Sequence, residues 1–118
     1  MNKKNILKYG ILIIFALVVS LRCVASPVNT SEFIEVDVAT WVEYANQMRD
    51  GKVMFKDIFD HKGPLMFGIY YIISFFGRNG VWLLDFAINS ISAIITFKIA
   101  KKYCKDDKKS ILVALIEL

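Results

Sequence analysis

The feature that most limits what this chain can fold into is the apolar run from Val81 to Ala100. At about 1.5 Å per residue, a helix of this length matches the hydrocarbon core of a bilayer, which is about 30 Å thick. Asp85 and Asn89 interrupt the run four residues apart, so they share one helical face, which we expect to point into protein rather than lipid. Hydrophobic residues make up 56% of the chain, more than is usual in soluble domains. The run therefore predicts a membrane-spanning helix at about 80–100.

A second apolar run, Tyr9 to Val24, predicts another span near the start of the chain. The run is slightly short for a bilayer, but Arg22 can extend its side chain to the headgroups and Ala25-Ser26 can lengthen the helix. The expected span is therefore about 9–26. A cleaved signal peptide is the alternative, because basic residues precede an apolar segment and small residues follow it. Both alternatives put the residues that follow outside the cytoplasm.

Lysines flank these two apolar runs and predict the topology. One cluster precedes the first run and the other follows the second; cytoplasmic segments are enriched in such residues. Two crossings place both clusters in the cytoplasm, whereas a third full crossing would put one cluster on the wrong side. The sequence thus predicts a multi-pass protein of the cell membrane with a cytoplasmic N-terminus. Because each cluster flanks an apolar run, a nucleic-acid partner is not expected. The clusters comprise Lys3, Lys4 and Lys8, and Lys98, Lys101, Lys102, Lys105, Lys108 and Lys109.

The segment 27–79, between the expected spans, contains two further helical patterns. Apolar residues recur at helical spacing over 37–50, and Gly51 is a natural C-terminal stop, so an amphipathic helix near the membrane surface is expected. Pro64 to Phe76 is apolar and aromatic but short, which favours an interfacial or re-entrant helix. Gly77 to Gly80 is expected to form a turn. Aromatic residues expected to anchor these segments at the interface are Trp41, Tyr44, Tyr70, Tyr71 and Trp82.

Together these patterns predict an all-α membrane protein with two transmembrane helices. The expected organisation is a first span up to residue 26, an extracytoplasmic loop at 27–79, a second span at 80–101 and the start of a third at 110–118. On this interpretation the 118 residues are the N-terminal part of a larger polytopic domain, and the remaining spans of that protein are among its partners, with membrane lipids. Cys23 and Cys104 fall on opposite sides, so a disulfide between them is not expected.

The stretch with the densest chemistry lies between Gly51 and Leu65. Asp57, Asp60, His61 and Lys62 fall within six residues, immediately before the apolar segment that begins at Gly63-Pro64. Ionisable groups at a membrane boundary are costly and are therefore candidates for function. The alternative is a solvated turn before a helix. Upstream, Asp37 is either functional or a cap for the helix that follows it.

The order of these features resembles the N-terminal region of GT-C class glycosyltransferases. The likeness is to the family 39-like group, which includes protein O-mannosyltransferases and the lipid A aminoarabinose transferase. Many bacterial members carry an acid, a helix ending in Gly, and then Asp-x-Phe-Asp-His-Lys-Gly-Pro-Leu; here these are Asp37, Gly51 and residues 57–65. The resemblance covers roughly residues 5–118. One departure is that relatives often have an Asp-Glu pair at the first acidic site, whereas Val38 follows Asp37 here.

The resemblance implies transfer of a sugar from a polyprenyl-phosphate carrier to an acceptor on the outer membrane face. It implies catalytic roles for Asp37, as general base, and for Asp60, which positions the acceptor or orients Lys62. Lys62, with His61, would balance the charge of the donor phosphate. No metal or cofactor site is expected, because no cluster of spaced His, Cys or carboxylate ligands is present. The competing hypothesis is a small non-enzymatic membrane protein that binds or regulates a partner complex.

Overall fold

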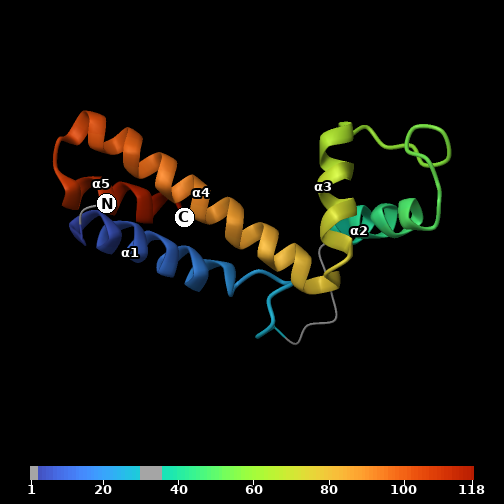
Figure 1. Ribbon diagram of the computed structural model, residues 1–118, viewed down its shortest axis with the longest axis horizontal. Helices are drawn as coiled ribbons and strands as arrows, with labels where there is room; N and C mark the ends of the chain where they lie inside the picture. Colours follow the sequence, from blue (N-terminus) through green and yellow to red (C-terminus); the bar gives the residue numbers. More distant parts are fainter. Residues whose placement is uncertain (1–2, 30–35) are drawn as a thin grey trace. The chain divides into compact units, whose positions relative to one another are not determined.

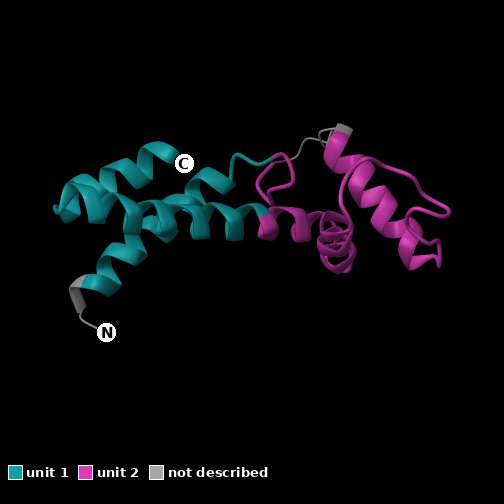
Figure 2. Ribbon diagram, turned by 90° about the horizontal axis from the view of Figure 1, so that it is seen from above, with its two compact units in different colours: residues 1–23, 85–118 teal, residues 24–84 magenta. Residues whose placement is uncertain are grey.

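The computed structural model describes residues 3–29 and 36–118, and over these residues the chain is all-α (Figure 1). The prediction of an all-helical protein is therefore confirmed. The described chain divides into two compact units, 1–23 with 85–118 and 24–84, and each is described by itself (Figure 2). The five helices are α1 (Lys3–Ser20), α2 (Val36–Arg49), α3 (Pro64–Ser74), α4 (Gly77–Cys104) and α5 (Asp107–Glu117).

In the first unit, α1, most of α4 and α5 pack around a small apolar core. Tyr9 meets Phe97 edge to face, with ring centroids 5.9 Å apart. Near the other end of α1, the Ser20 hydroxyl accepts a hydrogen bond from Asn89 at 3.1 Å. Because residue numbers rise along α1 as they fall along α4, the two helices are antiparallel. The core consists of Leu12, Ala93, Phe97 and Ala114, with Tyr9, Ile111, Leu115 and Leu118 packed against it.

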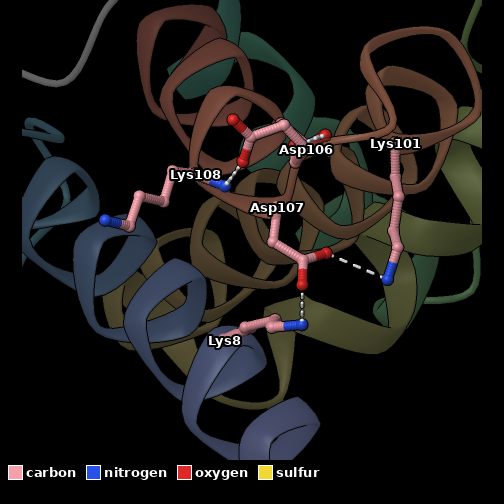
Figure 3. A network of polar contacts seen from close by, with 6 residues as sticks. Lys8, Lys101, Asp106, Asp107 and Lys108 are labelled. Atoms are coloured by element: carbon pink, nitrogen blue, oxygen red, sulfur yellow. Dashed lines mark hydrogen bonds and ion pairs between the residues drawn. The ribbon is translucent and has the colours of Figure 1, made fainter.

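One carboxylate joins all three helices at one end of this unit. Asp107, the first residue of α5, accepts hydrogen bonds from Lys8 of α1 and from Lys101 of α4, the latter at 2.9 Å (Figure 3). The N-terminal end of α1 thus lies beside the C-terminal end of α4. Asp106 caps α5 by accepting a hydrogen bond from the backbone N–H of Lys108 at 2.8 Å. The two lysine clusters, far apart in the sequence, therefore meet.

The first helix lies earlier in the sequence than predicted. It begins at Lys3 and ends at Ser20, whereas a helix at 9–26 was expected. Lysine is a good helix former, so the basic residues join the helix and do not precede it. After Ser20 the backbone bonds shorten to the i→i−3 type, at Arg22 and Cys23. Arg78 then donates to the carbonyl oxygens of Val24 and Asn29, which gives these groups a partner outside any helix.

The helix that contains the predicted second span is longer than 80–100. The expected turn at Gly77 to Gly80 is wrong, since these residues form the first turn of α4. The chain reverses at Phe75-Phe76, and Gly77 adopts a positive φ of 56° that glycine tolerates without strain. At the other end, Lys101 and Lys102 lie in the last helical turn, where the helix dipole favours positive charge. The lysines that were expected to follow the helix thus extend it.

In the second unit, α2 and α3 pack against each other through aromatic side chains. Trp41 and Tyr70 lie 5.3 Å apart between ring centroids, and Tyr44 and Phe67 lie 6.1 Å apart. Tyr70 is buried, so its predicted role as an interfacial anchor is wrong: the apolar face of α2 is covered by α3. The prediction that Gly51 stops α2 is confirmed. Its φ is 92°, and the bonds Gly51 N to Met48 O (3.1 Å) and Lys52 N to Gln47 O (3.0 Å) complete a Schellman motif.

Of the described helices, only α4 has both the length and the hydropathy of a membrane span. Two apolar helical stretches, Asn5–Ser20 within α1 and Pro64–Ser74 (α3), are shorter than a membrane span. A membrane location is compatible with this, although one such helix is a weak indication by itself. Pro64 is the first residue of α3, as its position in the sequence predicted, with Gly63 as the N-cap.

Candidate functional site

The loop from Gly51 to Gly63 contains the predicted site residues at its C-terminal end. Its first part is held by hydrogen bonds within the loop. The Asp57 carboxylate accepts from the backbone N–H of Val53 at 2.8 Å, and the Asp57 N–H donates to the Val53 carbonyl at 2.8 Å. The Phe55 N–H donates to Ile58 O at 2.7 Å, with Phe55 in the left-handed region at φ 64°. Ile58 is buried and anchors the loop. Asp57 is exposed and shapes the loop through these two bonds to Val53.

Asp60 organises the turn that leads into α3. Its Oδ1 accepts a hydrogen bond from the backbone N–H of Lys62 at 3.0 Å and lies 3.1 Å from Nδ1 of His61. The Asp60 side chain is only 13% exposed, whereas that of His61 is 82% exposed. Asp60 thus fixes the backbone from which Lys62 projects, and the imidazole of His61 remains open to solvent.

Lys62 reaches from this turn to the middle of α2. Its Nζ lies 5.7 Å from the centroid of the Trp41 ring, within the range of a cation–π contact. Asp37 is four residues before Trp41 in the same helix, so the two side chains share one face, about one helical turn apart. The structure therefore brings Lys62 to the helical face that carries Asp37.

Asp37 itself is exposed and is the second residue of α2. It lies inside the first turn, not at the N-cap position, and its negative charge is favoured there by the helix dipole. The four predicted site residues thus fall into two groups in the same unit. Asp60, His61 and Lys62 form one hydrogen-bonded turn, and Asp37 stands on the helix that Lys62 touches.

Two arginines that hold this unit together were not singled out from the sequence. Arg49 Nη1 donates to the Ser74 carbonyl at 3.3 Å, and its guanidinium lies 4.7 Å from the centroid of the Phe75 ring. Arg78 donates to Val24 and Asn29, as described above. Both arginines bind backbone carbonyls, and Arg49 also contacts a ring. Such partners do not depend on residue type or spacing, so the sequence contains no pattern that identifies these two arginines. Trp41 is different, because its i+4 relation to Asp37 was visible, but its contact with Lys62 requires the tertiary structure.

Within the described residues, no three His, Cys, Asp or Glu side chains gather as a metal site would require. The arrangement offers three groups for chemistry: the exposed carboxylate of Asp37, the ammonium of Lys62 and the solvent-facing imidazole of His61. They belong to the unit in which α2 and α3 make their aromatic contact. No protein-family model matches the chain, and no curated protein or solved structure matches it either.

Proposed function

We propose that this chain contributes the donor-binding part of a glycosyltransferase that uses a polyprenyl-phosphate sugar on the outer face of the cytoplasmic membrane. The observation that carries the proposal is the contact of Lys62 with Trp41, one turn from Asp37. A carboxylate and an ammonium from the two halves of the resembled motif thereby share one surface. An enzyme of the resembled class has many more spans, so the activity belongs to a larger protein.

In this mechanism the acceptor oxygen attacks the anomeric carbon of the sugar. The bond between that carbon and the phosphate oxygen breaks, and the polyprenyl phosphate leaves with the bonding electrons. The acceptor proton passes to the carboxylate of Asp37, which is exposed and therefore accessible to an acceptor. The ammonium of Lys62, whose backbone Asp60 fixes, balances the charge on the departing phosphate. His61 lies on the same turn, open to solvent, and stands beside Lys62 at that phosphate.

The membrane arrangement we propose has α1 and α4 crossing in opposite directions, with α3 at the outer interface and α5 at the start of a third span. Three observations support it. α4 has the length and hydropathy of a span. α1 is antiparallel to it, and its 18 residues extend about 27 Å. The lysine clusters meet at one end, as two segments on the same side of a membrane would.

The test of the proposed base is Asp37→Asn in the protein that carries the remaining spans. A general base contributes about 10²- to 10⁴-fold, so sugar transfer from the polyprenyl-phosphate donor should fall by at least about 10²-fold. The matched control is Asp57→Asn, which changes an exposed acid of the same unit but keeps an acceptor oxygen for Val53. Wild-type transfer by Asp37→Asn would remove it as the base and make Asp60 the next candidate.

Donor binding is tested separately on the chain described here, purified in detergent. Lys62→Ala should weaken binding of polyprenyl phosphate, whereas Lys56→Ala, an exposed lysine of the same loop, should not. In a Trp82→Phe background, the fluorescence of Trp41 reports the interaction, because the ring lies beside the Lys62 ammonium. If the wild-type chain binds no polyprenyl phosphate, or if both variants bind equally well, the donor assignment is overturned and a non-enzymatic role in a partner complex is favoured.

A further inference from the structure

The end of the first unit at which α1, α4 and α5 meet is strongly basic. We call it the basic end and define it by seven lysines from the three helices. Six of them are exposed; Lys8 alone is partly buried, with its side chain 17% exposed. Only two acidic residues, Asp106 and Asp107, lie among them in the sequence from 98 to 109. The lysines of the basic end are Lys8, Lys98, Lys101, Lys102, Lys105, Lys108 and Lys109.

Both acids are occupied by contacts within the protein. Asp107 binds Lys8 and Lys101 at once (Figure 3), and these hydrogen bonds hold the pKa of its carboxyl below the usual range. Asp106 caps α5 through the N–H of Lys108. Over the described part of the chain, the ammonium groups of Lys105 and Lys108 have no ion-pair partner. Asp106 and Asp107 thus hold the helix ends together, whereas the ammonium groups of Lys105 and Lys108 can bind an external anion.

Apolar side chains lie next to these lysines and are also exposed. Tyr103 is 77% exposed in the last turn of α4, and Ile99 is 55% exposed one turn earlier. In α5, Leu112 is 58% exposed, one turn after Lys108. Tyrosine with lysine is the combination found where a helix leaves the hydrocarbon layer and enters the headgroups. A surface that binds nucleic acid is more polar than this one, since protein–nucleic-acid contacts are made mainly by charged and polar groups.

From these features we infer that the basic end binds the phosphate groups of anionic glycerophospholipids in the membrane that holds α4. Each lipid phosphate carries a negative charge and accepts hydrogen bonds from ammonium groups, and Tyr103, Ile99 and Leu112 contact the adjoining acyl region. The inference rests on the membrane location in the proposed function and is independent of sugar transfer. Loss of transfer in Asp37→Asn would therefore leave it unaffected, and its own failure would leave the transferase proposal standing.

The experiment uses the full chain reconstituted in vesicles of phosphatidylcholine and phosphatidylglycerol in equal parts. Spin-labelled forms of each lipid measure their relative association with the protein. The wild-type protein should prefer phosphatidylglycerol. In the double variant Lys105→Gln/Lys108→Gln that preference should fall by roughly 25-fold, because each juxtamembrane lysine adds about fivefold to anionic-lipid binding and the two factors multiply. Neither substitution touches the contacts of Asp107, so the helix ends stay in place.

The matched control is Lys52→Gln/Lys56→Gln, which removes the same charge from exposed lysines of the other unit. It should retain the wild-type preference. Equal preference for the two lipids in the wild-type protein, or an equal loss in both double variants, overturns the inference. So does a third result: binding of a fluorescent DNA duplex by the detergent-purified protein at physiological salt that Lys105→Gln/Lys108→Gln abolishes, with lipid preference unchanged.

Discussion

At the scale of single residues, two glycines occupy positions where any residue with a Cβ would be unfavourable. Gly51 ends α2 with a positive φ, which a residue with a Cβ adopts at a cost. Gly80 is different, because its constraint comes from packing. A Cβ placed on Gly80 would lie 2.2 Å from the carbonyl oxygen of Ile73, which belongs to α3. The close approach of α4 to the end of α3 therefore depends on the missing side chain.

We predict that Gly80→Ala destabilises the protein by about 1–3 kcal/mol, as is typical when an atom is forced into a packed site. Gly68→Ala is the control. Gly68 lies inside α3 with open space around the position of a Cβ, so alanine should stabilise the protein by about 0.5–1 kcal/mol. Chemical unfolding in detergent measures both. Equal stability of the two variants would contradict the close contact between Gly80 and Ile73.

At the scale of helices, α4 carries a row of polar side chains that form hydrogen bonds with the neighbouring helices. Asp85, Asn89, Ser92 and Thr96 recur at helical spacing. Asn89 donates to Ser20 of α1 at 3.1 Å and to Asp85 at 3.2 Å. The Ser92 hydroxyl donates to Glu117 of α5 at 2.6 Å. The prediction that Asp85 and Asn89 face protein is thus confirmed for Asn89, and the partner lies within this chain.

A double-mutant cycle tests the contact between α1 and α4. Ser20→Ala and Asn89→Ala should show a coupling energy of about 0.6 kcal/mol, and at most about 1.7 kcal/mol, as found for hydrogen bonds between membrane helices. Ser20→Ala combined with Thr96→Ala is the control, since Thr96 lies about 10 Å further along α4 and contacts Glu117. The control pair should be additive. Zero coupling between Ser20 and Asn89 would contradict the helix pairing.

At the scale of the whole molecule, the native cysteines report the topology. Cys23 follows α1, and Cys104 is the last residue of α4, beside the basic end; both are free thiols. In the two-crossing arrangement Cys104 is cytoplasmic, and Cys23 lies towards the outer face. Lys56 lies in the loop that precedes α3 and is expected outside as well.

We predict that a membrane-impermeant maleimide applied to intact cells labels Cys23 in Cys104→Ser and fails to label Cys104 in Cys23→Ser. Permeabilised cells should show labelling of Cys104, which controls for its reactivity. Because Cys23 is half-buried, Lys56→Cys in a variant without native cysteines provides a second, exposed outer site. Labelling of Cys104 from outside would contradict the two-crossing topology.

The helical segments could be predicted from the sequence, because helix formation depends on local patterns. The periodic apolar residues of α2, its stop at Gly51, and Pro64 at the start of α3 were all visible in the chain. It also indicated the acidic and basic residues of the motif at 57–65. Helix ends were less predictable: the bonds of Arg22 and Cys23 to Val19 and Ser20 close α1 at Ser20, and the Phe75-Phe76 turn precedes α4 at Gly77.

Which of these segments meet became clear from the folded chain. Lys62 lies on Trp41, and Asp107 joins Lys8 to Lys101, through contacts between residues far apart in the chain. Tyr70 is buried against α2, although its sequence context is equally typical of an interfacial anchor. Such contacts follow from how helical faces pack, and a one-dimensional pattern shows that a face is apolar or charged without showing which face will cover it.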